Sequence, residues 1–142
     1  MFRRSLLIAL LTALPSLADV TKILAEPNLE RRSALALEEV DFALTSARKA
    51  YESQQFDDFR KQLADAAEMT QLCYQSLQDS GKRARRSPKW FKHAEQRLLV
   101  IQRRVDALVK DVSADDRPPV EAVQVKIREI HDQVLQDIMS RK

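Results

Sequence analysis

The 142-residue chain contains one glycine, one cysteine and two histidines. Walker A and GxGxxG turns need several glycines, because the backbone must approach phosphates without a Cβ in the way. A single glycine therefore excludes a nucleotide-binding loop of either kind. A single cysteine excludes an intrachain disulfide framework, a CxxC redox pair and a c-type haem site.

Groupings that would support catalysis or metal binding are also missing. No serine has the flanking glycines of a nucleophile elbow. Dimetal helical bundles use Glu-x-x-His pairs, but Arg128 stands three residues before His131, and Trp90 three before His93. We therefore expect no metal, no cofactor and no enzyme activity, and a metal-binding bundle is only the second alternative.

Two isolated reactive groups are expected to serve the fold. Cys73 falls on an apolar helix face, where a buried thiol acts as a small hydrophobe; an intermolecular disulfide is its functional alternative. His131 adjoins Ile130 at the edge of another apolar face. We expect it to be partly exposed, with Glu129 and Asp132 directed to other faces.

The N-terminus has the pattern of an export signal. Two arginines precede the apolar run 6–14, and small residues follow it. This order is typical of a secretory signal peptide, and the run is too short to cross a bilayer. We expect residues 1–18 to be removed by cleavage near Ala18. A single domain, residues 19–142, is then periplasmic or secreted.

Apolar residues recur at alternating steps of three and four in four long segments, and no useful length alternates with period two. Such steps place the apolar side chains on one face of a helix. The chain is therefore expected to be all-α, with helices at about 28–53, 56–80, 88–112 and 117–140.

The ends of these segments carry helix signals. Asn28 can open the first helix, and the lone Gly81 can take a left-handed position after the second. Ser87 and Pro88 suit the third helix as a hydroxyl cap and a first-turn proline. Asp115 or Asp116 is a candidate cap for the fourth.

Short connections favour antiparallel neighbours, so the four helices are expected to form two hairpins. A closed four-helix bundle is the favoured arrangement, and an open pair of tetratricopeptide-like hairpins is the alternative. Ala36, Ala43 and Ala50 are spaced seven residues apart and would allow one close helix approach.

The segment 51–56, with Ala47 and Ala50 before it and Ala66 after it, resembles the junction between the two helices of a tetratricopeptide repeat. The resemblance covers about one repeat length and implies one repeat-like hairpin. Phe59 replaces the family's small alanine and no second copy follows. The chain also resembles small secreted bacterial helical proteins, which implies a fold and a compartment but no activity.

Charge is distributed unevenly. The net charge of +3 includes the two arginines of the export signal. Residues 19–81 carry net −5 and residues 98–142 are balanced, whereas residues 82–97 carry +6 beside Trp90. The useful feature is therefore a basic joint between the second and third helices.

We take this basic joint as the candidate docking site for an anionic partner; its residues are Lys82, Arg83, Arg85, Arg86, Lys89, Trp90 and Lys92. The alternative is a solvated linker, with Phe91 on the core and the charges in water. Attraction to a negative membrane surface is worth about 1 kcal/mol per base. An exposed Trp90 would add to it by seating at the interface. Nucleic acid is not expected as a partner, because export separates the protein from it.

The sequence thus predicts an exported, non-catalytic helical protein with a protein-interaction or structural role in the cell envelope. The alternative is a module that docks on an anionic surface or a membrane through residues 82–92. Four partner classes stay open: an unknown protein, an anionic envelope component, a membrane contacted peripherally, and a second copy in a homodimer.

Overall fold

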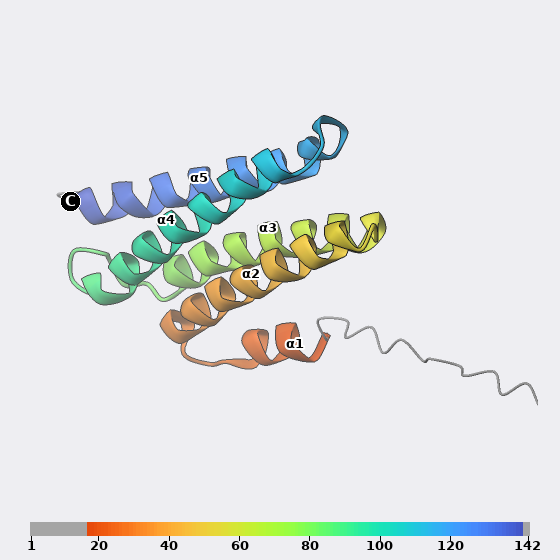
Figure 1. Cartoon of the computed structure of the whole chain (residues 1–142). Coiled ribbons are helices and arrows are strands. Elements are labelled where there is room, and N and C mark those ends of the chain that lie inside the picture. Colours follow the sequence, from red (N-terminus) through yellow and green to blue (C-terminus); the bar gives the residue numbers. More distant parts are fainter. Residues whose placement is uncertain (1–16, 141–142) are drawn as a thin grey trace, which may run out of the picture.

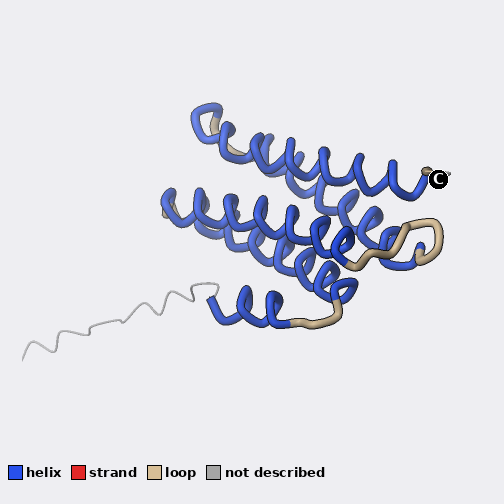
Figure 2. Tube along the Cα trace, turned by 180° about the vertical axis from the view of Figure 1, so that it is seen from behind, coloured by secondary structure: helices blue, strands red, loops and turns tan. Residues whose placement is uncertain are grey.

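The computed structural model describes residues 17–140, with side chains from residue 20 onward. Its elements are α1 (Leu17–Ala25), α2 (Leu29–Glu52), α3 (Phe56–Asp79), α4 (Pro88–Asp111), a 3₁₀ turn (Ala114–Asp116) and α5 (Arg117–Met139) (Figure 1). The described part of the chain holds no strand (Figure 2). The all-α prediction is confirmed, and α2 to α5 begin and end within one residue of the expected ranges.

The predicted signal peptide lies outside the described residues except for its last two positions, which begin α1. The spacing of apolar residues predicts no helix over residues 19–27, because α1 is too short for that spacing to repeat. Ile23 of α1 is buried in the core cluster, and the Arg32 guanidinium donates hydrogen bonds of 2.7 and 3.1 Å to the Glu26 carbonyl. These contacts hold α1 against α2.

The four long helices form a closed bundle of two antiparallel hairpins, α2–α3 and α4–α5 (Figure 1). α2 packs beside α4, and α3 packs beside α5, which closes the ring. Neighbours from different hairpins run in the same direction. On α2, Asp41 pairs with Arg104 of α4, and two turns further along both helices Arg48 pairs with Asp111.

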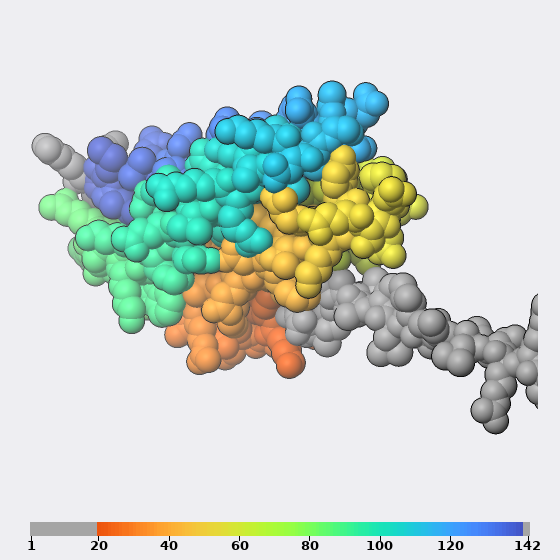
Figure 3. Space-filling model, viewed as in Figure 1, coloured from red at the N-terminus to blue at the C-terminus, as the bar shows by residue number. Residues whose placement is uncertain are grey.

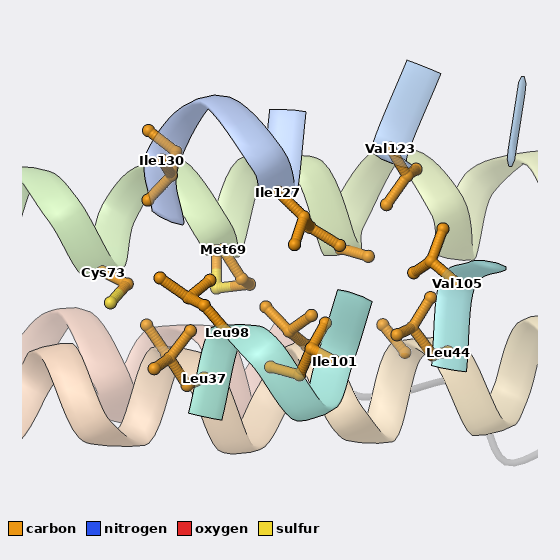
Figure 4. Packing of buried hydrophobic residues seen from close by; sticks show 14 of the residues in the cluster. Leu37, Leu44, Met69, Cys73, Leu98, Ile101, Val105, Val123, Ile127 and Ile130 are labelled. Carbon is orange, nitrogen blue, oxygen red and sulfur yellow. The ribbon is translucent and has the colours of Figure 1, made fainter. Parts of the chain in front are cut away.

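All four long helices contribute to one apolar core (Figure 4). Its side chains come from the faces that the spacing of three and four defines, and fully burying one aliphatic side chain contributes about 1.5–3 kcal/mol. Those labelled in Figure 4 are Leu37, Leu44, Met69, Cys73, Leu98, Ile101, Val105, Val123, Ile127 and Ile130. Ala36, Ala43 and Ala50 are buried as well.

Tyr51 ties the two hairpins together at one end of the bundle. Its hydroxyl accepts a 2.9 Å hydrogen bond from the Ser113 amide and donates a 3.2 Å bond to the Asp116 carboxylate. Asp116 precedes α5, but its side chain makes no capping bond because it faces Tyr51 and the Ser113 hydroxyl. Asp116 therefore occupies the N-cap position expected of it, but without the side-chain bond of a cap.

The other residues predicted to begin or end helices agree with the structure, except for Ser87. Asn28 caps α2 by accepting a 3.0 Å hydrogen bond from the Arg31 amide, and Gly81 has a φ of +67°, both as predicted. Pro88 occupies the first turn of α4. The hydroxyl cap predicted at Ser87 is wrong, because that side chain makes no capping bond.

Candidate functional site

The basic joint begins where α3 is closed off. The Ser80 hydroxyl donates a 2.6 Å hydrogen bond to the Leu77 carbonyl, and Gly81 takes the left-handed conformation that a side chain resists. The chain then makes a turn in which the amides of Arg86 and Ser87 both donate to the Arg83 carbonyl at 3.0 Å. The backbone of the joint is therefore a defined turn.

Two apolar side chains anchor this turn to the bundle. Ala84 is buried within the loop, and Phe91 is buried in the first turn of α4. The expectation that Phe91 lies on the core is confirmed. Because both anchors point inward, the cations that alternate with them are left on the outside.

The seven predicted site residues fall into two groups. The six cations are exposed: Lys82, Arg83, Arg85, Arg86, Lys89 and Lys92. Trp90 is half-buried and packs against the core cluster, with the Lys89 ammonium 5.2 Å from its ring centroid. Trp90 is therefore not an exposed side chain that is free to insert into a membrane interface.

The cations of the joint differ in what they contact. Lys82 forms an ion pair with Glu30 in the first turn of α2. Arg83, Arg86 and Lys92 form no ion pair within residues 17–140. At least three positive charges of the joint are thus balanced by no acid in the described chain.

Two open hollows lie beside these cations. The smaller, of about 250 Å³, is lined by Gln78, Lys82, Arg83, Ala84, Arg85, Phe91, Asp137 and Ser140. The other, of about 600 Å³, is lined by Gly81, Lys82, Arg83, Arg86 and Ser87. Lys82 and Arg83 border both hollows, so an anion in either one would meet the same two cations.

Asp137 is the acid at the edge of the smaller hollow, and its charge is already engaged. The Tyr74 hydroxyl and the Gln78 amide donate to the same carboxylate oxygen at 3.1 and 3.0 Å. Burial, and then the charge of Asp137 and this hydrogen bond, raise the pKa of Tyr74 above its ordinary value. The carboxylate therefore fastens α3 to α5 instead of pairing with the joint.

Cys73 is buried, as the pattern predicted, and forms no disulfide. Its sulfur lies 3.2 Å from the Ser33 hydroxyl. Burial raises the pKa of the thiol to about 12, although the hydrogen bond with Ser33 acts in the opposite direction. Because the thiolate is the nucleophilic form, this side chain is suited to packing and not to chemistry.

The prediction for His131 is wrong. The side chain is buried between α4 and α5, with Nε2 3.0 Å from the Glu95 carboxylate and Nδ1 3.4 Å from that of Asp132. The acid from α4 is a neighbour that spacing along α5 alone does not reveal. Within residues 17–140, no group of three or more His, Cys, Asp or Glu side chains is arranged to hold a metal ion.

Sequence reasoning also missed three neighbours of the joint, namely Glu30, Gln78 and Asp137. They approach it only when the helices pack, so local spacing carries no signal for Gln78 or Asp137. Glu30 could have been recognised from the sequence, because it lies two turns before Leu37 on the apolar face of α2. A charge on that face requires a partner from elsewhere in the fold.

The fold and the joint define the chain as an all-α helical bundle with one strongly basic turn. No helix of the described chain combines the length and the apolar character needed to cross a bilayer. Comparisons with protein-family models, curated proteins and solved structures find no match to the chain.

Proposed function

We propose that this protein is a non-catalytic binding protein that docks an anionic partner through the basic joint. The observation that carries the proposal is that six cations are exposed on this turn and the start of α4, while Ala84 and Phe91 fix the backbone to the core. A fixed backbone keeps the base of each cationic side chain in place, so less backbone entropy is lost when a partner binds.

The reactive side chains of the bundle favour a binding role over an enzymatic one. Cys73 is buried and its pKa is raised to about 12, and His131 is enclosed by two carboxylates. Tyr51 and Tyr74 both hold elements of the fold together. Each of these groups has a structural task that explains its position.

Retention on a polyanionic column, such as heparin, tests the proposal. We expect the protein to be retained at low salt and released as salt rises, since exposed charges are screened over about 10 Å at 0.1 M salt. The variant R83E/R86E/K92E should elute far earlier, because these three cations have no ion pair to lose within residues 17–140.

A matched control places the same charge change elsewhere. K61E/R103E/K110E also reverses three exposed cations that form no ion pair in the described chain. It should be retained nearly as well as the parent if location matters. Equal loss of retention in both variants would show that net charge alone is responsible, and the basic joint would lose its role.

Export is the second part of the proposal and rests on the order of regions within residues 1–18. We expect the exported protein to begin at Asp19, after cleavage next to Ala18. Mass spectrometry of the exported fraction measures this directly. Recovery of a chain that still contains Phe2 would contradict cleavage.

A further inference from the structure

We propose that the anionic partner is the surface of a negatively charged bilayer, met by the basic end of the bundle. This inference rests on the proposed function and names its partner class. An acidic protein is the competing class, and the observations below favour the lipid surface.

The first observation is the position and shape of the joint. The turn that joins α3 to α4 lies at one end of the bundle, beside the C-terminal end of α5 (Figures 1 and 3). The two hollows at this end are open to solvent, and Lys82 and Arg83 border both. A turn at the end of a bundle can place several long cationic side chains against a flat surface together.

The second observation is the absence of an apolar centre within the turn. Specific protein interfaces are usually built around buried aromatic or aliphatic anchors. In the joint, Ala84 and Phe91 point into the bundle, and Trp90 packs against the core with Lys89 beside its ring. A lipid surface needs no such anchor, because its attraction for basic residues depends on charge density.

The third observation is Met139, the last residue of α5, which is 71% exposed. It lies between Asp137 and Ser140 in the chain, and both of these line the smaller hollow together with Lys82 and Arg83. Met139 does not line this hollow itself, but it places an exposed apolar side chain at the same end of the bundle, which suits the boundary between headgroups and acyl chains. We expect Met139 to add a modest contribution to attachment that is mainly electrostatic.

The expected size of the effect follows from the number of cations. Each base near a negative membrane surface contributes about 1 kcal/mol, or roughly a fivefold change in affinity. Neutralising Arg83, Arg86 and Lys92 should therefore weaken binding on the order of 100-fold. The attachment should also weaken steeply with salt, because exposed charges are screened.

Co-sedimentation of the full chain with vesicles tests this inference. One set of vesicles contains phosphatidylglycerol with phosphatidylcholine, and the other contains phosphatidylcholine alone. The neutral set reports any contribution of the apolar run 6–14. We expect excess binding to the anionic vesicles, lost in R83A/R86A/K92A and kept in the control K61A/R103A/K110A. M139S should give a smaller, several-fold loss.

Two outcomes would overturn the inference: no excess binding to anionic vesicles, or an excess that R83A/R86A/K92A retains in full. If the joint still governs retention on heparin in that case, the proposed function stands and an acidic protein or polymer becomes the partner. If retention on heparin is also independent of the joint, both proposals fail. Circular dichroism of each variant confirms that a loss of binding is not a loss of fold.

Discussion

Lys82 of the basic joint pairs with Glu30 in the first turn of α2, whose side chain is only 10% exposed. Lys82 is thus part of the candidate docking surface and also the partner of a nearly buried carboxylate. We expect K82A to lower the free energy of unfolding by about 2 kcal/mol, since it leaves that carboxylate unpaired. R83A and R86A should each change it by about 0.5 kcal/mol or less.

Urea unfolding of the three variants measures this difference. A double variant, K82A/E30Q, should recover part of the loss because the buried group is then neutral. If K82A is no less stable than R83A, the ion pair contributes nothing to the fold and Lys82 belongs to the docking surface alone.

Tyr51 provides a second prediction. Y51F removes a hydroxyl that both accepts from the Ser113 amide and donates to Asp116, so we expect a loss of about 1–2 kcal/mol. Y74F should cost less, because Asp137 keeps its hydrogen bond from Gln78. Thermal unfolding of both variants tests the order, and a larger loss for Y74F would contradict it.

Cys73 makes stability depend on alkaline pH. Its pKa is about 12 in the folded protein against an ordinary value of 9.0, so above pH 9 only the unfolded chain loses this proton. Stability should therefore fall by about 1.4 kcal/mol per pH unit between pH 9 and about 12. C73A should remove this dependence.

Urea titrations at neutral pH and at about pH 10 measure the slope. Tyr74, whose pKa is also raised, adds a fall in the same direction at higher pH, so Y74F serves as the reference background. An identical alkaline loss with and without Cys73 would show that its thiol ionises equally in both states.

Gln54 provides a stabilising substitution. Its φ of +59° places a side chain in the left-handed region at the turn between α2 and α3, where a non-glycine residue costs about 1–2 kcal/mol. Q54G should raise the free energy of unfolding by roughly 0.5 kcal/mol after the entropy of a flexible unfolded chain is subtracted. G81A, at a φ of +67°, should lower it by about 1 kcal/mol.

The extent of the helices could be predicted because the signals are local. The step from Phe91 to Ala94 and Leu98 already defines a helix face, and it is the face that is buried. The pairing of α2 with α4 and of α3 with α5 could not be predicted in this way. It depends on residues far apart in sequence, such as Asp41 and Arg104.

In the candidate site, too, local features could be predicted from the sequence and contacts between helices could not. The exposure of the cations could be predicted, because they alternate with the apolar residues Ala84 and Phe91, which point inward. The half-buried position of Trp90 depends on what packs beside α4, which no periodicity specifies. His131 is enclosed for a similar reason, since Glu95 reaches it from a neighbouring helix.

The like-directed packing of α2 beside α4 has a kinetic consequence. Contacts within each hairpin join residues near in sequence, whereas Asp41 reaches Arg104 only after a long chain segment has been closed into a loop. We therefore expect the hairpins to form first and to dock late. D41A should then speed unfolding and leave the folding rate nearly unchanged, which stopped-flow chevron analysis would measure.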